Sequence, residues 1–324
     1  MKKTSLPLGV DLGSSRVRIA LSEHADGAAR LVAVASRDLP EDTVTAESIA
    51  EPELVAAVIE DAHREIGTHE RRCVFSVGAE AASLRLVRFP AMSEPERRRA
   101  AHFEAERIAP WDLGMVATIV RAHAADRARQ LYGVGIARAT VLSSRSRCVT
   151  AAGLRPVAAD YEGCAWHRAF PEYDAVLDIG YRRSTLHVFS PAGPLAVVVG
   201  GGGAEMTGAI AADLGIDVPA AERRKCLLGN AGAGVAARDE FVQAVRTALT
   251  KARERMPGLR RFSVTGNGSR LVGLLEAIES ACGVRAEHST SGVLASNAYP
   301  SDVLRASAHD WTLAVSLAAW SVRA

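Results

Sequence analysis

The sequence predicts an α/β fold of two related lobes, each a mixed β-sheet flanked by helices. The main observation is a repeat, because Asp11-x-Gly13 and Asp178-x-Gly180 each end an apolar strand and lead through a tight turn into a second strand. The order of elements also supports a two-lobed fold, since strands open each half and amphipathic helices follow. The chain of 324 residues is long enough for two halves plus an inserted module.

The first half opens with three predicted strands, at 8–12, 17–22 and 31–37. A helix is expected over 52–66, because apolar residues recur at helical spacing from Leu54 to Ile59 and Gly67 ends the pattern. A buried strand over 73–77 follows. This order is typical of a mixed α/β half-domain.

Between 79 and 139 the pattern changes, and we interpret this stretch as an inserted subdomain. It holds a strand over 84–89 and a capping box, Ser93-x-x-Glu96, that predicts a helix as far as Ala109. A strand-like stretch lies near 115–121. The chain then returns to the first half with a strand over 132–141 and helices near 145–152 and 161–170.

The second half begins at Asp174, and its first strands end at Ile179, Phe189 and Val199. Glycines at 200–203 lead into a helix that ends at Leu214. The remaining predicted elements are helices from about 219 and over 239–256, a strand over 262–265, a helix to 282 and a last helix from 310. Both halves therefore start with a hairpin.

Composition narrows the class of function. The formal charge of +2 gives no electrostatic argument for nucleic acid as a partner. The five cysteines are widely spaced and form no CxxC pair, which argues against a zinc site or a disulfide framework and favours a reducing, cytoplasmic setting. No apolar stretch is long enough to span a membrane, and neither an HExxH motif nor a Walker-type P-loop is present.

The repeated hairpin is suited to holding a polyphosphate between the two halves. Glycine lets the backbone of a turn approach an anion, and the N–H groups of the turn point at it. Asp11 and Asp178 would then face each other across a cleft, where two carboxylates can hold the water shell of a magnesium ion. One copy alone would fit an ordinary hairpin equally well, and the presence of two in equivalent positions favours a shared cleft.

The ordered motifs DLGSS, YEGCA, DIGYRRST, GGGGAEMT, AERRK and TGNGSRL resemble those of the superfamily that includes actin, Hsp70 and sugar kinases. Residues 84–110 are similar to the 1C subdomain of the FtsA and PilM families, and residues 158–170, 202–216 and 221–229 are most similar to the PilM family. The resemblance covers nearly the whole chain. It implies an actin-like (ribonuclease H-like) fold with subdomain 1A at 1–78 and 140–173, a 1C insert at 79–139, and subdomains 2A and 2B at 174–324.

The resemblance also implies ATP and Mg²⁺ as ligands and gives a role to each matching residue. The phosphate loops are Asp11, Gly13, Ser14 and Ser15 in one half and Asp178 and Gly180 in the other, with Asp11 and Asp178 holding the metal. The remaining nucleotide contacts are Gly202 and Gly203 before a helix, Glu222 and Lys225 at the ribose and adenine, and Gly266 and Asn267 in the adenosine loop. Glu162 is the candidate catalytic residue that orients the attacking water.

Plainer interpretations stay open for several of these residues. From the residues alone, Gly202 and Gly203 fit a tight strand-to-helix turn, Glu222 and Lys225 fit a surface ion pair, and Glu162 fits an exposed glutamate without a role. Arg270 either borders the base or belongs to a solvated surface.

Tyr181, Arg182 and Arg183 depart from the family pattern, which has small residues and threonine in the second loop. Either these side chains fill the space of the β- and γ-phosphates, or the guanidinium groups bind phosphate as a charged fork. The sequence leaves both outcomes open, and with them whether ATP binds and whether it is hydrolysed.

The resemblance implies a cytoplasmic assembly protein of a type IV pilus or a related secretion machine, without membrane insertion of its own. Its implied partner is a PilN-like single-span membrane protein, whose N-terminal cytoplasmic tail binds between subdomain 1A and the 1C insert and brings the protein to the inner membrane. One alternative is a pseudo-ATPase scaffold of the same fold that binds no nucleotide. The other is a small-molecule kinase, for which the insert lacks an evident acidic motif.

Overall fold

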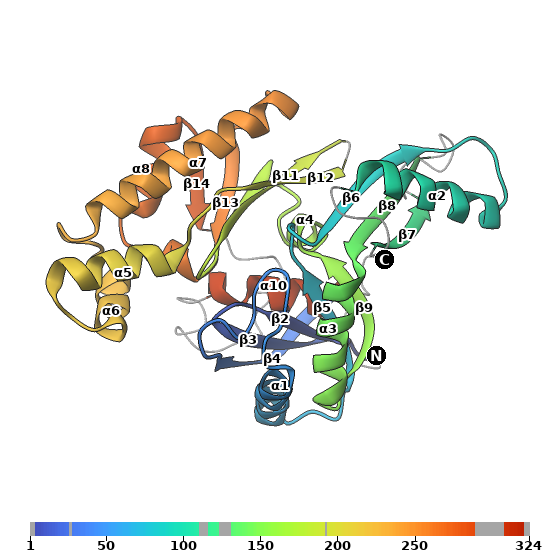
Figure 1. Cartoon of the computed structure of the whole chain (residues 1–324), viewed down its shortest axis with the longest axis horizontal. Coiled ribbons are helices and arrows are strands. Elements are labelled where there is room, and N and C mark those ends of the chain that lie inside the picture. The colour runs from blue at the N-terminus through green and yellow to red at the C-terminus, as the bar shows by residue number, and fades with distance from the viewer. Residues whose placement is uncertain are drawn as a thin grey trace.

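The computed structural model describes residues 4–25, 28–109, 116–122, 131–191, 193–288 and 308–320. These residues form three β-sheets, and Figure 1 shows the two larger sheets as separate layers with the smallest sheet to one side. No helix in this described part of the chain is both long enough and apolar enough to cross a membrane.

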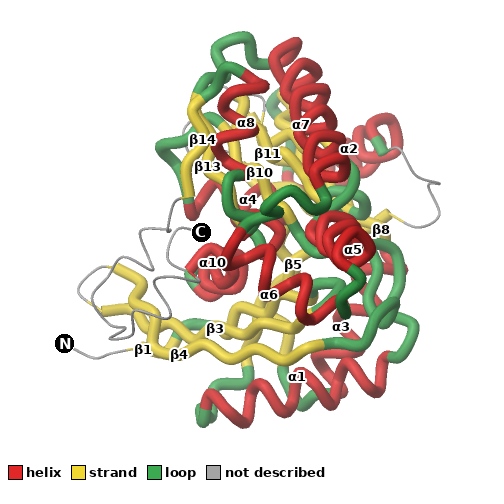
Figure 2. The backbone as a smooth tube through the Cα atoms, turned by 90° about the vertical axis from the view of Figure 1, so that its left-hand side faces the viewer, coloured by secondary structure: helices red, strands yellow, loops and turns green. Residues whose placement is uncertain are grey.

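The first sheet has the strand order β4-β3-β2-β5-β9, with β1 paired to the far end of β3. Its strands are β1 Thr4–Ser5, β2 Leu8–Leu12, β3 Arg16–Ala25, β4 Ala28–Asp38, β5 Arg72–Val77 and β9 Arg155–Tyr161. Helices α1 (Pro52–Ile66) and α3 (Ala139–Ala151) pack together on one face. Helix α10 (Ala308–Ala318) covers the other face over β2 and β3 (Figure 2).

The second sheet repeats this plan with the strand order β12-β11-β10-β13-β14. Its strands are β10 Ala175–Ile179, β11 Ser184–Ser190, β12 Gly193–Val198, β13 Arg261–Thr265 and β14 Arg285–His288. In both sheets the opening hairpin is antiparallel, β2 with β3 and β10 with β11. The strands that follow pair in parallel: β2 with β5 and β5 with β9 in the first sheet, and β10 with β13 and β13 with β14 in the second. The predicted duplication is therefore present in the topology itself.

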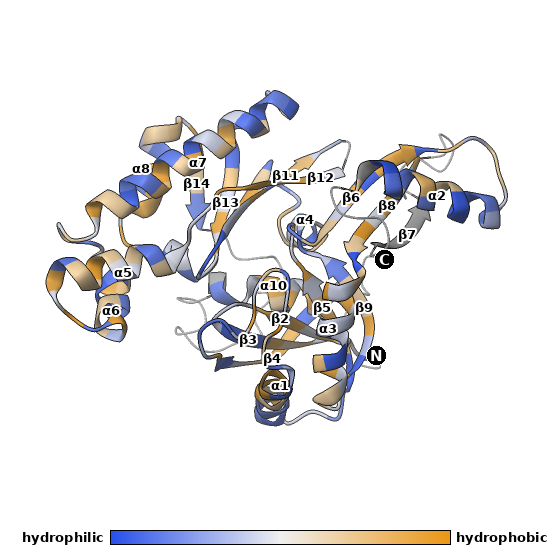
Figure 3. Ribbon diagram, viewed as in Figure 1, coloured by the Kyte–Doolittle hydropathy of each residue, from blue (hydrophilic) through white to orange (hydrophobic). Residues whose placement is uncertain are grey.

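Helices of the second lobe pack against the second sheet or at the far end of it. They are α5 Gly203–Leu214, α6 Val218–Leu228, α7 Val235–Arg255 and α8 Leu274–Cys282. Helix α7 alternates hydrophobic and hydrophilic residues along its length (Figure 3), and its buried face includes Phe241, Val245 and Leu249. This periodicity is that of a helix with one face on a core.

The small third sheet lies within the stretch predicted as an insert. Its strands β6 (Ala82–Arg88), β8 (Leu131–Arg138) and β7 (Val116–Ala122) pair antiparallel in that order, beside α2 (Glu94–Ile108). The predicted capping box is confirmed, because Ser93 N donates a hydrogen bond to Glu96 Oε2 at 2.8 Å. The assignment of subdomain borders to the family scheme stays a prediction.

Two helices join the lobes. Helix α4 (Glu162–Ala169) and α10 share an apolar cluster that includes Trp166, Phe170, Leu313 and Leu317, together with Val176 of the second sheet. Although α10 falls within 174–324, it packs on the first sheet and on α4. This shared core places the two opening hairpins opposite each other.

The structure differs from the predicted elements in several places, and the two-residue strand β1 is one that was not predicted. Strands β9 and β14 were not predicted, because both are short outer strands in which charged residues interrupt the apolar pattern. The strand predicted over 132–141 ends at Arg138, and α3 begins at Ala139. Val141 belongs to the buried face of α3, together with Arg145 and Cys148, and its β-branched side chain was misleading.

Candidate functional site

The two repeated turns have the same backbone geometry. Gly13 N donates to Arg16 O at 3.1 Å in the first, and Gly180 N donates to Arg183 O at 2.9 Å in the second. A Cβ atom added at Gly13 would lie 2.9 Å from Arg16 O, and one added at Gly180 would lie 2.8 Å from Arg183 O. Each turn folds back on its own glycine, so a side chain does not fit there.

Both turns line one cleft of about 390 Å³ between the lobes. The aspartates of the two hairpins therefore converge from opposite lobes, as the repeat predicted. Among the sequence-predicted residues, the cleft is lined by Asp11, Gly13, Ser14, Ser15, Glu162, Asp178, Gly180, Gly266 and Asn267. Four others lie outside its lining: Gly202, Gly203, Glu222 and Lys225.

Three of the carboxyl groups that line the cleft, those of Asp11, Glu162 and Asp178, have raised pKa values. Burial raises the pKa of Asp11, against the opposing effect of Arg18 and Arg145, and burial likewise raises the pKa of Glu162. Burial, followed by repulsion from Glu162 and Asp11, raises the pKa of Asp178 to about 7. Burial thus disfavours the charged form of these carboxyl groups, and a bound cation would stabilise it.

The alternative of an exposed Glu162 is wrong, because this residue is 8% exposed at the start of α4. Its Oε1 lies 3.8 Å from Arg183 Nη2 of the second turn. Glu162 therefore faces the cleft and already has a cationic neighbour.

Two cleft arginines were missed at the level of sequence. Arg18 Nη1 donates to Asp11 Oδ2 at 3.4 Å, and the buried Arg145 donates from Nη1 to Leu12 O at 3.2 Å. Arg18 could have been found, because Asp11 and Arg18 are paired residues of the hairpin. Arg145 gave a weaker signal, as a lone arginine on the apolar face of α3.

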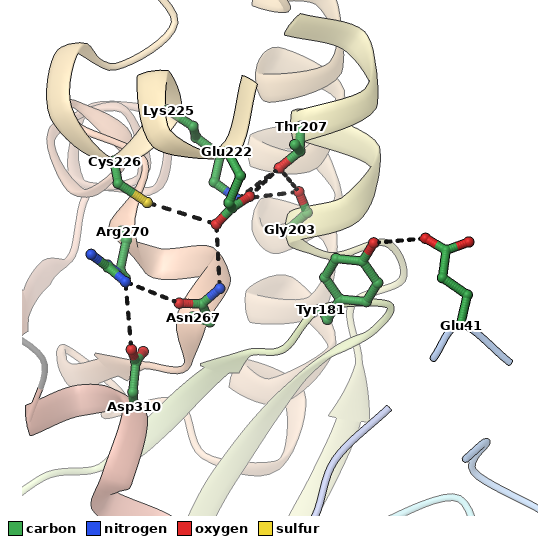
Figure 4. Close-up of polar contacts among 10 residues, drawn as sticks. All are labelled: Glu41, Tyr181, Gly203, Thr207, Glu222, Lys225, Cys226, Asn267, Arg270 and Asp310. Carbon is green, nitrogen blue, oxygen red and sulfur yellow. Dashed lines mark hydrogen bonds and ion pairs between the residues drawn. The ribbon is translucent and has the colours of Figure 1, made fainter. Parts of the chain in front are cut away.

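The divergent side chains of the second turn reach across to the first lobe. Tyr181 Oη donates to Glu41 Oε1 at 3.0 Å (Figure 4), and Arg182 pairs with Glu41 and Asp42 at 3.5 and 3.1 Å. Arg183 turns into the cleft. All three residues line the cleft. The guanidinium of Arg183 is placed where phosphate could meet it, whereas Tyr181 and Arg182 contact the acidic loop after β4.

Lys225 is not part of a surface ion pair, because only 1% of it is exposed. Its ammonium group donates to Glu222 Oε2, Thr207 Oγ1 and Gly203 O at 2.6, 2.9 and 3.3 Å (Figure 4). Burial pushes the pKa of Glu222 upward, but Lys225 and Thr207 outweigh it and the pKa lies below its ordinary value. The ammonium group of Lys225 thus has its hydrogen-bond partners within the protein.

Glu222 is linked to the cleft through the turn after β13. Asn267 Nδ2 donates to Glu222 Oε1 at 3.3 Å, and Arg270 Nη1 lies 3.5 Å from Asn267 Oδ1 and 3.7 Å from Asp310 Oδ2 (Figure 4). Asn267 and Asp310 line the cleft. Arg270 therefore contacts two residues of the cleft lining, Asn267 and Asp310, without lining the cleft itself.

The start of α5 supports the second turn. Gly203 N donates to Gly180 O at 2.9 Å and Ala204 N donates to Tyr181 O at 2.8 Å, while Gly202 N donates to Glu205 Oε2 at 2.8 Å. The N–H groups at this helix end are thus bonded within the protein. Contact of Gly202 and Gly203 with a ligand stays a prediction.

No cluster of three or more histidine, cysteine, aspartate or glutamate side chains in the described residues is arranged to bind a metal ion directly.

Comparison with known proteins gives a consistent result. A family model described as type IV pilus assembly protein PilM matches residues 9–320. The fold is similar to a chain of a PilM–PilN type IV pilus biogenesis complex, with 24% identity, a TM-score of 0.76 and coverage of 98% of this chain and 99% of that one. It is also similar to the ethanolamine utilization protein EutJ from Carboxydothermus hydrogenoformans, with 15% identity, a TM-score of 0.57 and coverage of 99% and 91%. None of the curated proteins compared with the chain matches it. With an actin-like fold and a family match over nearly its whole length, the chain belongs to the PilM family of type IV pilus assembly proteins.

Proposed function

We propose that this PilM-family chain is a cytoplasmic assembly protein of a type IV pilus or a related secretion machine, and that it binds ATP with Mg²⁺ between its lobes. The observation that carries the proposal is the convergence of two equivalent glycine turns, with Asp11 and Asp178, on one cleft. Bare backbone on both sides of a cleft is suited to a ligand with several phosphate groups.

The residues on each side of the cleft fit such a ligand. The backbone of Gly13 and Gly180 and the hydroxyl groups of Ser14 and Ser15 would bind phosphate oxygens. Asp11 and Asp178 would hold a magnesium ion through its water shell, which fits two buried carboxyl groups whose pKa values burial raises. The ion would neutralise charge on the phosphates.

The adenosine end of the ligand would lie at Gly266 and Asn267, which line the cleft. Glu222 touches Asn267, and the ammonium group of Lys225 is fully used within the protein. We therefore assign Glu222 and Lys225 a positioning role behind the adenosine loop.

Hydrolysis is expected to be slow. Glu162 is the candidate for orienting the attacking water, but its carboxylate faces the guanidinium of Arg183 at 3.8 Å. Although burial raises the pKa of Glu162, this guanidinium would compete with an incoming water for the carboxylate oxygens.

The proposed partner is the N-terminal cytoplasmic tail of a PilN-like single-span membrane protein, which would keep the chain peripheral to the inner membrane. Support comes from the related chain in the PilM–PilN complex. In this chain β9 is the outer strand of the first sheet, it lies near β6 of the insert, and Val157 on it is 42% exposed. An extended tail can pair with such an edge.

Calorimetric titration with ATP and Mg²⁺ tests the nucleotide, and titration with an N-terminal tail peptide of a PilN-like protein tests the partner. We expect saturable ATP binding that is lost when Mg²⁺ is chelated. Absence of ATP binding at millimolar concentration, with the tail still bound, would leave the pseudo-ATPase scaffold as the function. That second candidate is favoured by one observation, the contact of Arg183 with Glu162 and with Glu80 across the cleft.

A further inference from the structure

The insert joins the first lobe at a compact turn. The N–H groups of Ala81 and Ala82 donate to Gly78 O at 3.0 and 2.9 Å, after β5 ends. Where the chain returns from β8, Arg138 N donates to Ala81 O at 2.8 Å. Both crossings between lobe and insert thus meet at residues 78–82, which we call the insert root.

Arg183 of the second turn lies directly against the insert root. Its Nη1 donates to Glu80 Oε2 at 2.6 Å, with the two side chains 33% and 24% exposed. A Cβ atom added at Gly78 would lie 2.6 Å from Arg183 Nη2, so the missing side chain makes room for the guanidinium. The same residue closes the second turn, because its carbonyl accepts from Gly180 N.

The guanidinium of Arg183 also lines the cleft. It lies between two carboxylates, Glu80 and Glu162, and a phosphate group in the cleft would offer it a pair of acceptor oxygens in place of them. Glu80 is partly exposed and can be hydrated if the guanidinium leaves it. Glu80 and an anionic ligand therefore compete for the guanidinium group of Arg183.

The insert also contacts the second lobe at a second place, where β12 lies beside β6. A Cβ atom at Gly193, where β12 begins, would lie 3.5 Å from Leu86 Cγ of β6. The insert thus touches the second lobe at its root and along its first strand.

We propose that Arg183 couples the cleft to the insert. When it is paired with Glu80 it fixes the insert root, and a polyphosphate that enters the cleft draws the guanidinium away and loosens the root. The proposal rests on the proposed function only for the identity of the anion as a nucleotide.

The first test uses the ligand-free full chain and measures amide hydrogen exchange of residues 81–88. Arg183→Gln and Glu80→Gln should each speed this exchange by about threefold to tenfold, as expected for loss of one partly buried ion pair. Arg182→Gln is the matched control, because the neighbouring arginine contacts Glu41 and Asp42 instead, and it should leave exchange at 81–88 unchanged. Unchanged exchange in both the Arg183 and Glu80 variants would overturn the link.

The second test measures the affinity of inorganic tripolyphosphate. Glu80→Gln should bind it about threefold more tightly, because Arg183 is released, whereas Arg183→Gln should bind it about tenfold more weakly, because two carboxylates are left facing the anion. A change of the same sign in both variants would overturn the competition. If tripolyphosphate binds and ATP does not, the nucleotide function is wrong and the coupling stands; if the wild type binds neither, the competition fails as well, while the exchange test still decides the link.

Discussion

The first turn keeps its contacts within its own lobe, whereas the second turn reaches across the cleft. The fourth residue of each turn is an arginine: Arg16 bonds to Asp38 of the neighbouring strand β4, and Arg183 bonds to Glu80 of the other lobe. The backbone hydrogen bond that closes the two turns is nevertheless the same. Backbone geometry thus preserves the duplicated site, and the side chains decide whether a turn holds its lobe together or joins the lobes.

The aspartates differ in a similar way. In the hairpin register Asp11 is paired with Arg18, and Asp178 is paired with Thr185. Asp11 therefore has a guanidinium beside it, while the pKa of Asp178 rises to about 7. Two carboxylates in equivalent positions are held in unequal electrostatic surroundings, so variants of the pair can be compared directly.

The largest expected effect is on magnesium-dependent ATP binding. Asp11→Asn and Asp178→Asn should each weaken it by about tenfold to a hundredfold, because both carboxylates face the same cleft and neither can replace the other. Calorimetric titration with and without Mg²⁺ measures this, with Asp239→Asn in the exposed ion pair with Arg238 of α7 as control. A loss in only one of the two variants would mean that the turns do not share a ligand.

The turn glycines should have nearly equal effects on folding. Gly13→Ala and Gly180→Ala should each lower the free energy of unfolding by about 1–3 kcal/mol, because the new methyl group meets a carbonyl oxygen of the same turn. Urea denaturation measures the free energy of unfolding of both variants and of the wild type. Gly208→Ala in α5 is the matched control, where nothing lies within 4 Å of the added Cβ, and should be neutral or stabilising by up to about 1 kcal/mol.

The pH dependence of stability should separate the two aspartates. The pKa of Asp178 rises from 3.8 to about 7 on folding, so the folded protein keeps a proton that the unfolded chain releases, and ligand-free stability falls as the pH rises through that window. Asp178→Asn removes this fall and should be more stable than the wild type at pH 8 by about 1–2 kcal/mol.

Thermal unfolding at pH 5 and pH 8 measures this difference. Asp11→Asn should gain less stability at pH 8 than Asp178→Asn, because it leaves Arg18 without its carboxylate partner. An Asp178→Asn protein that keeps the full pH dependence of the wild type would contradict this view of the site.

The smallest effect is expected for Arg182. Its contacts with Glu41 and Asp42 are exposed, and surface ion pairs contribute about 0–1 kcal/mol, so Arg182→Gln should change the free energy of unfolding by less than about 0.5 kcal/mol. Urea denaturation in low and high salt would show it. A larger loss of stability would mean that these exposed ion pairs contribute more to the free energy of unfolding than surface pairs usually do.

Local pattern was enough to predict much of the fold. The bounds of β2 and α1 follow from an apolar run and from a helical repeat closed by Gly67, and the structure has both as predicted. The outer strands β9 and β14 were missed, because four to seven residues with charges among them carry no clear period.

The site was predictable where it repeats and unpredictable where distant residues meet. The Asp-x-Gly repeat located both turns, but Arg183 and Glu80 are 103 residues apart and nothing local links them. Burial of Lys225 was likewise hidden, because an i, i+3 spacing looks the same on a buried face and on a solvated one.

The position of α10 has a consequence for the order in which the protein is made. A Cβ atom at Gly9 of β2 would lie 1.9 Å from Ala314 O, so the strand and the helix are in intimate contact although they stand near opposite ends of the chain. During synthesis β2 leaves the ribosome long before α10, and until then one face of its sheet stays uncovered. The nascent chain therefore needs protection of that apolar face, and a chain released early would lack the cover that joins its halves.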